Sequence, residues 1–150
     1  MSSAQVIDKL NECLRWEWTG LAQYAQHSFI VSGPWREVYS EMFRDGAEEC
    51  FKHARRIGEK IVAMGGVPTV EREPIVQSDD LDEMLRANLE FERTAVKRYS
   101  ETLDLVADDH ALRVLIEDMI LEEQDGVDHL ERILRDKKLI GGPTAARKSG

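Results

Sequence analysis

A long connector between two halves of the sequence constrains the fold of this chain more than any other feature. Four segments repeat apolar residues at spacings that alternate between three and four, which predicts amphipathic helices over about residues 4–31, 34–64, 79–107 and 110–138. The links near Gly33 and Asp108 are short, so each half is predicted to form an antiparallel helical hairpin.

The connector from Gly65 to Ser78 is different, because it contains 14 residues with two prolines. At ~3.3 Å per extended residue it can reach ~46 Å, whereas a helix of ~28 residues is ~42 Å long. It can therefore run the whole length of a bundle and let the second and third helices point the same way. The predicted fold is all-α, a four-helix bundle with one long crossover. We expect a single domain over residues 1–150, with a flexible tail over 139–150.

Composition excludes several classes of partner. A formal net charge of −9 argues against nucleic acid, because phosphate binding needs a basic face, and it suits metal ions instead. No window approaches the ~18 uncharged apolar residues of a membrane span. The two cysteines form no disulfide or zinc-ribbon framework and fit a reducing compartment, so we expect a cytoplasmic location and no membrane partner.

Polar residues interrupt all four apolar stripes at mid-length, at positions where the periodicity points inward. They are Glu17, His53, Glu92 and Glu123. Three carboxylates in one core would repel one another unless protons or a cation neutralised them. For any one residue, rotation of its helix toward solvent is the favoured explanation. Four coincidences at similar depth favour a metal site, because di-metal bundles draw carboxylates and histidines from all four helices.

The chain resembles a bacterioferritin over roughly residues 5–138. The stretches that carry the resemblance are Leu10-Asn11-Glu12 through Glu17 to Gln23-Tyr24, Lys52-His53-Ala54, Met84-Leu85-Arg86 with Leu89 and Glu92, and Glu122-Glu123-Gln124-Asp125 before Leu130-Glu131. The resemblance implies a ferritin-like four-helix subunit that self-assembles into a hollow shell. Because little sequence follows the fourth helix for the fifth helix of ferritins, we expect a homo-oligomer that is either a dimer or a ferritin-type shell. The resemblance also implies oxidation of Fe(II) by dioxygen or peroxide, with storage of the ferric product.

Transferred position by position, the family's ligand set is incomplete. Glu17 and Glu92 match the terminal carboxylates of the first and third helices, His53 the histidine of the second, and Glu123 the bridging carboxylate of the fourth. Two positions depart from the family pattern: Cys50 replaces the bridging glutamate of the second helix, and Gly126 replaces the histidine of the fourth. The family's interfacial methionine, a haem ligand, falls at Phe51, so we expect no haem.

These departures predict unequal metal positions. Glu17 and His53, bridged by Glu123, would hold one ion, whereas a second ion would have only Glu92 and the bridge. We therefore expect one or two irons per subunit, with weak or absent ferroxidase activity. Cys50 is either a metal ligand or a small buried residue, and the second interpretation is favoured. As a thiolate ligand it would shift the preference from iron toward zinc or another soft divalent ion.

Neighbouring acidic and imidazole side chains could, in principle, replace the two absent ligands. Glu49 with His53, and Asp125 with His129, are i,i+4 pairs that share a helix face. Ligation through them would require local rotation or a π-bulge, because the apolar stripes place Cys50 and Gly126 inward. We expect Glu49, Glu122, Asp125 and His129 to be solvated or interface residues instead.

Two functional hypotheses follow. The first is a bacterioferritin-like iron-binding and iron-storage protein with an altered di-metal centre. The alternative is a non-catalytic structural or ligand-binding subunit that co-assembles with an active paralogue. A di-metal oxygenase or peroxidase on the same scaffold is disfavoured, because such chemistry also needs the full ligand set.

Overall fold

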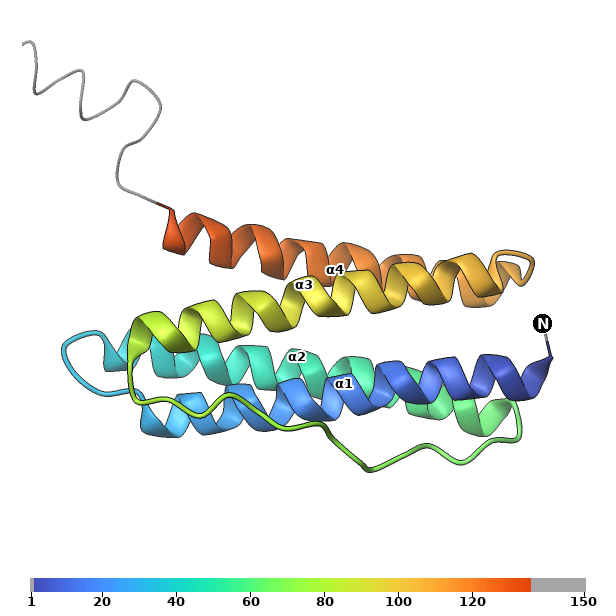
Figure 1. The fold of residues 1–150 in the computed structure, drawn as a ribbon, viewed down its shortest axis with the longest axis horizontal. Helices are drawn as coiled ribbons and strands as arrows, with labels where there is room; N and C mark the ends of the chain where they lie inside the picture. The colour runs from blue at the N-terminus through green and yellow to red at the C-terminus, as the bar shows by residue number, and fades with distance from the viewer. Residues whose placement is uncertain (1, 136–150) are drawn as a thin grey trace, which may run out of the picture.

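The computed structural model describes residues 2–135 and contains four helices in that range. They are α1 (Ser3–Ile30), α2 (Arg36–Ala63), α3 (Leu81–Val106) and α4 (His110–Leu134). No strand occurs in the described part of the chain (Figure 1). The predicted all-α bundle is confirmed. The predicted end of the fourth helix at residue 138 and the tail over 139–150 lie outside the described residues.

Side-chain caps set the helix starts where the sequence supplies them. Asp80 accepts a hydrogen bond from the backbone N–H of Glu83, and Asp109 accepts one from Leu112, so α3 and α4 begin directly after these residues. The second helix begins at Arg36, two residues after the predicted start near Pro34. Gly33 has φ +93° and its carbonyl accepts from the N–H of Arg36, so Pro34 lies in a turn before α2.

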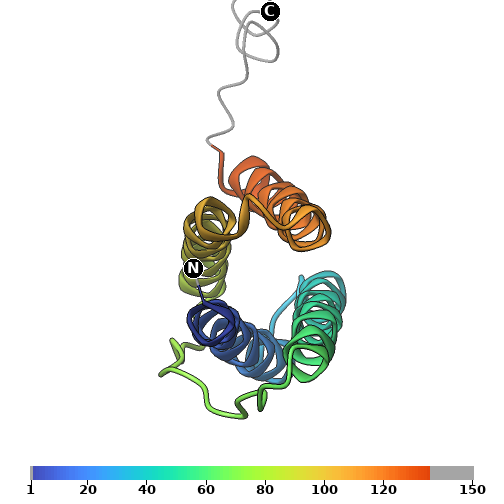
Figure 2. The same cartoon turned by 90° about the vertical axis from the view of Figure 1, so that its right-hand side faces the viewer.

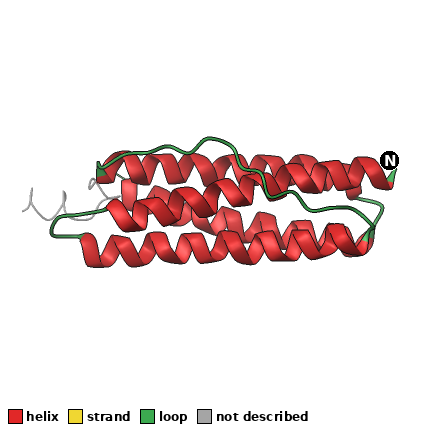
Figure 3. Ribbon diagram, turned by 90° about the horizontal axis from the view of Figure 1, so that it is seen from below, coloured by secondary structure: helices red, strands yellow, loops and turns green. Residues whose placement is uncertain are grey.

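The long connector is a crossover, as predicted. It runs along the outside of α1 for the length of the bundle (Figures 1 and 3), so α2 and α3 point in the same direction. Seen from the end, the four helices form a ring in which α1 lies beside α2 and α3, and α4 lies beside α3 (Figure 2). This arrangement directs one face of each helix toward a common interior.

Polar side chains of α1 fasten the crossover to the bundle. The Asn11 side chain donates to the carbonyl of Val67 at 3.1 Å and accepts from the N–H of Thr69 at 2.8 Å. Trp18 Nε1 donates to the Thr69 carbonyl at 2.8 Å, and the Thr19 hydroxyl accepts from the N–H of Glu73 at 2.8 Å. The connector is therefore an ordered strap, because its backbone groups are paired with fixed side chains.

Two apolar clusters fill the interior, one toward each end of the bundle. One includes Leu10, Leu14, Ile57, Ile61, Ile116 and Met119. The other includes Tyr24, Phe43, Leu85, Val127 and Leu130. The four predicted polar residues are buried at mid-length, with exposed fractions of 0% for Glu17 and His53, 8% for Glu92 and 3% for Glu123. Among residues 2–135, no helix has the length and apolar character that a bilayer span requires.

Candidate metal centre

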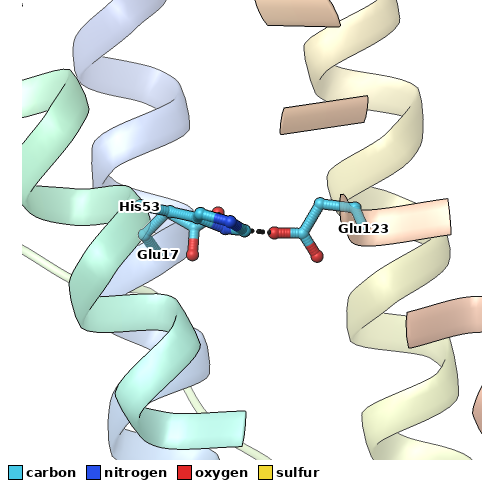
Figure 4. Close-up of side chains that lie close together, drawn as sticks. All are labelled: Glu17, His53 and Glu123. Carbon is cyan, nitrogen blue, oxygen red and sulfur yellow. Dashed lines mark hydrogen bonds and ion pairs between the residues drawn. The ribbon is translucent and has the colours of Figure 1, made fainter. Parts of the chain in front are cut away.

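Three of the predicted ligands converge from three helices. Glu17 of α1, His53 of α2 and Glu123 of α4 each offer a ligand atom, and these atoms lie within 4.8 Å of one another. His53 Nδ1 lies 2.8 Å from Oε1 of Glu123 and 3.5 Å from Oε1 of Glu17. Figure 4 shows Glu17 and His53 side by side, with Glu123 reaching toward them from the opposite side. The pattern of interrupted apolar stripes thus located a real cluster.

One oxygen of this cluster has no partner among the described residues. The Tyr99 hydroxyl donates to Oε1 of Glu17 at 2.6 Å, whereas Oε2 of Glu17 is buried without a hydrogen bond. A buried carboxylate oxygen without a donor costs free energy, because burial removes the water that would otherwise solvate it. A cation bound between Glu17 and Glu123 would remove that cost.

Charge is crowded at the cluster. Burial lowers the pKa of His53, but hydrogen bonds to Glu123, Glu17 and Glu49 raise it, and the net pKa lies well above the usual histidine value. Burial raises the pKa of Glu123 to about 7, and the charge of Glu17 adds to the rise. The carboxylates around His53 therefore favour the protonated form of its imidazole.

Glu92 is not one of the three converging ligands, although its carboxyl group lies next to that of Glu123. The Tyr24 hydroxyl donates to its Oε1 at 2.6 Å, and burial together with the charge of Glu123 raises its pKa well above the usual range. Its carboxyl group lies against Gly126, where an added β-carbon would be 2.9 Å from Cδ of Glu92. The glycine thus makes room for this carboxyl group.

Cys50 is buried and lies outside the ligand groups found in the described residues. A β-carbon added at Gly20 would be 2.7 Å from its Sγ, so the thiol fills space next to that glycine. Burial, and then the charge of Glu17, raises its pKa well above the usual thiol value. A neutral thiol is a poor metal ligand, and this environment favours Cys50 as a packing residue.

Glu49 and Glu122 contact the outer face of His53, which the sequence analysis did not predict. Oε1 of Glu49 lies 3.0 Å from His53 Nε2, and Glu122 Oε2 also contacts that nitrogen. Their side chains are 45% and 30% exposed, so they are partly solvated as expected. The i,i+4 spacing of Glu49 and His53 was the available signal, and no π-bulge is present in α2.

A family model described as a ferritin-like domain matches residues 7–140, which is most of the chain. This chain belongs to the ferritin-like family. The bundle with one long crossover and the buried carboxylates at mid-length agree with that assignment.

Individual relatives support the assignment to the ferritin-like family. The chain is 31% identical to a bacterioferritin from Rhodobacter capsulatus, over 85% of this chain and 81% of the relative. It is 28% identical to a bacterial ferritin from Neisseria meningitidis, over 91% and 90% of the two chains. A solved structure described as a ferritin-like, diiron-carboxylate protein from Bacillus anthracis superposes with a TM-score of 0.86 and 32% identity, covering 90% of this chain and all of that one.

The donor atoms fit one metal ion better than two. Glu17, His53 and Glu123 supply two carboxylates and an imidazole, a donor set that suits iron and other divalent metals, and one buried oxygen of Glu17 has no hydrogen-bond partner among the described residues. A second interior ion would have Glu92 and Glu123 as donors, with a neutral thiol at Cys50 and no side chain at Gly126.

Proposed function

We propose that this protein binds iron at an asymmetric interior centre and oxidises it slowly or not at all. The observation that carries the proposal is the convergence of Glu17, His53 and Glu123, with one buried carboxylate oxygen lacking a partner. Membership of the ferritin-like family supports iron as the substrate. The relatives' bacterioferritin and ferritin names support binding and storage as the role.

The chain's own groups suit binding better than rapid oxidation. Glu17 and Glu123 would neutralise the charge of the incoming ion, and the Tyr99 hydroxyl fixes the orientation of Glu17 through a 2.6 Å hydrogen bond. Reduction of dioxygen to peroxide requires two electrons, which two adjacent Fe(II) ions supply together. With Glu92 held by Tyr24 and Gly126 carrying no donor, the second position retains iron poorly, and coupled oxidation is slow.

Restoring the two missing ligands tests this proposal. We expect the purified protein to consume oxygen slowly after Fe(II) is added. The Cys50→Glu variant with Gly126→His should oxidise Fe(II) at least ~10-fold faster, because the second ion regains a bridge and an imidazole. Glu92 must shift for the new histidine, because a β-carbon at position 126 would lie 2.9 Å from its Cδ, and this shift would weaken its hydrogen bond with Tyr24.

The matched control is Cys50→Gln with Gly126→His, which fills the same volume without the bridging charge. It should gain less activity than the variant with glutamate. Rapid oxidation by the unaltered protein, or equal rates for the glutamate and glutamine variants, would contradict the proposed asymmetry.

We also propose that haem is absent and that the protein assembles with copies of itself. Phe51 offers no donor atom at the position of the family's haem ligand, and its side chain is 49% exposed next to Trp18. Absorption spectra of the protein, expressed with haem precursor supplied, should lack a Soret band, and Phe51→Met is the variant that could gain one. Light scattering would distinguish a dimer from a shell, and a monomer would contradict self-assembly.

A further inference from the structure

The two helical hairpins meet along two seams, α1 with α3 and α2 with α4, which are joined very differently. Along the α1–α3 seam, hydrogen bonds made by side chains recur from Cys13 to His27, over ~21 Å of α1. They join Cys13 with Thr102, Trp16 with the Phe91 carbonyl, Glu17 with Tyr99, Tyr24 with Glu92, and both Gln23 and His27 with Asn88. Most of these groups are buried, so this seam does not depend on exposed contacts.

The α2–α4 seam is joined at one level only. Among the described residues, the hydrogen bonds and ion pairs between these two helices start from Lys52, His53 and Arg56, a stretch of ~6 Å. Lys52 and Arg56 reach partly exposed carboxylates of α4, at 3.5 and 3.3 Å, and exposed ion pairs contribute little to stability. The buried link is the 2.8 Å contact between His53 Nδ1 and Glu123 Oε1.

A cavity lies beside this buried link. It has a volume of ≈ 270 Å³, and its lining includes Met42 and Gly46 of α2 and Gly126 and Leu130 of α4. Figure 2 shows a wider separation between α2 and α4 than between the other neighbouring helices. Side chains that line a cavity lack dispersion contacts on one side. The α2–α4 seam therefore resists separation less than the α1–α3 seam does, and local opening is expected where such contacts are few.

We propose that the metal-free bundle opens transiently between α2 and α4, and that an interior ion closes this seam. An ion ligated by His53 of α2 and Glu123 of α4 would bridge the two helices at the level where they already meet. A ligand that binds only the closed form shifts the population toward that form. Opening of the metal-free protein stands without the proposed function, whereas closure rests on the interior ion.

The two buried cysteines are natural probes, one for each seam. Cys50 of α2 is 3% exposed and belongs to the apolar cluster that contains Val127 and Leu130 of α4. Cys13 is 2% exposed and pairs across the α1–α3 seam with the Thr102 hydroxyl at 3.3 Å. Neither thiol can react with iodoacetamide until its own seam opens or the whole protein unfolds.

Alkylation followed by mass spectrometry of the two cysteine peptides tests the opening. In metal-free protein, with each rate divided by that of the same thiol in denaturant, Cys50 should react at least ~10-fold faster than Cys13. Arg56→Ala removes an ion pair across the α2–α4 seam and should speed the alkylation of Cys50 by roughly 2–5-fold. The matched control, Arg93→Ala, removes an ion pair between α3 and α4 and should leave that rate unchanged. Equal protection of the two thiols, or equal effects of the two variants, would overturn the opening.

Zn(II) tests the closure in the unaltered protein. At a free concentration of ~100 times its Kd, it should slow the alkylation of Cys50 ~100-fold, the factor expected when the ion binds the closed form alone. Unchanged alkylation with Zn(II) bound would overturn closure and leave the proposed metal site intact, whereas no Zn(II) binding would overturn closure together with that site. Thiolate-to-metal charge-transfer absorption with Co(II) would show that an ion shields Cys50 by ligating it, and would also overturn closure.

Discussion

Two buried polar clusters in this bundle can be compared. They differ in whether their polar atoms are all hydrogen-bonded to one another and in whether their charges cancel. One is the carboxylate cluster of Glu17, His53 and Glu123. The other is an amide cluster of Gln23, His27 and Asn88 that joins α1 and α3 to the crossover. In the amide cluster Gln23 Nε2 donates to Asn88 Oδ1 at 2.9 Å, and Asn88 Nδ2 pairs with His27 Nδ1 at 3.0 Å.

The amide cluster is complete by itself. His27 Nε2 lies 2.8 Å from the carbonyl of Val76, and the N–H of Val76 donates to Gln23 Oε1 at 3.0 Å. Each of these groups is neutral and has a partner, so the cluster fastens the crossover and needs no ligand. The carboxylate cluster has excess negative charge and an unpartnered oxygen. The two clusters are both buried, so what distinguishes the proposed metal site is its unpartnered oxygen and its excess of carboxylates.

The largest expected effect is the loss of metal binding when His53 is removed. His53→Ala should weaken Zn(II) binding by more than the ~10–100-fold that loss of an outer-shell partner causes, because the imidazole serves the carboxylates on both of its faces. Competition with a chromophoric chelator measures this affinity. His110→Ala, at the exposed start of α4, is the control and should bind as the unaltered protein does. Equal affinities for the two variants would exclude His53 as a ligand.

A substitution in the amide cluster should lower the stability of the fold and leave metal binding unchanged. Asn88→Leu leaves Gln23 Nε2 and His27 Nδ1 without partners, at a cost of about 1–3 kcal/mol in the free energy of unfolding. Denaturant titration measures that cost. Metal stoichiometry should be unchanged, and a loss of metal would show that the two clusters are not independent.

Acid should destabilise the amide cluster by a smaller amount. Burial lowers the pKa of His27 from 6.5, although the hydrogen bond to Val76 opposes the shift. Below pH 6.5, His27 binds a proton in the unfolded chain but not yet in the folded chain. The free energy of unfolding therefore falls as the pH decreases from 6.5 toward the lowered pKa of His27 in the folded chain. His27→Gln should flatten this slope in metal-free protein. An unchanged slope would mean that His27 is not the responsible group, and His110→Ala is the control.

The smallest effect is expected at Glu92. Glu92→Gln keeps a side chain of similar shape with an oxygen that can accept from the Tyr24 hydroxyl, and burial already disfavours the charged form of this carboxyl group by raising its pKa. The free energy of unfolding should change by less than about 1 kcal/mol, the net value of one hydrogen bond. The first metal ion should bind as before. Loss of that ion would make Glu92 a ligand of the first position.

The sequence was sufficient for the fold and for the inward residues. Apolar periodicity and the length of the connector predicted the topology, and the interruptions at Glu17, His53, Glu92 and Glu123 predicted burial, which is confirmed. Apolar periodicity indicates which face of a helix a residue occupies, but it does not indicate which residues a long side chain contacts. It therefore missed both contacts with His53, because the long, partly exposed side chain of Glu49 reaches along α2 and that of Glu122 reaches across from α4.

The packing at Gly126 was also hidden from the sequence. From the resemblance to bacterioferritins, Gly126 was interpreted only as the loss of the histidine ligand of the fourth helix. In the structure it also provides space for the carboxyl group of Glu92, a contact between α3 and α4 that no local pattern encodes. Cys50 likewise fills space next to Gly20, which only the packing of α1 against α2 reveals.

Anaerobic titration with Fe(II) is the most direct measurement of the proposed asymmetry. Mössbauer spectroscopy of protein loaded with ⁵⁷Fe would count the bound ions, and the Cys50→Glu, Gly126→His variant would serve as the two-ion reference. We expect one tightly bound Fe(II) per subunit in the unaltered protein and two in the variant. Two tightly bound ions in the unaltered protein would contradict the unequal interior positions.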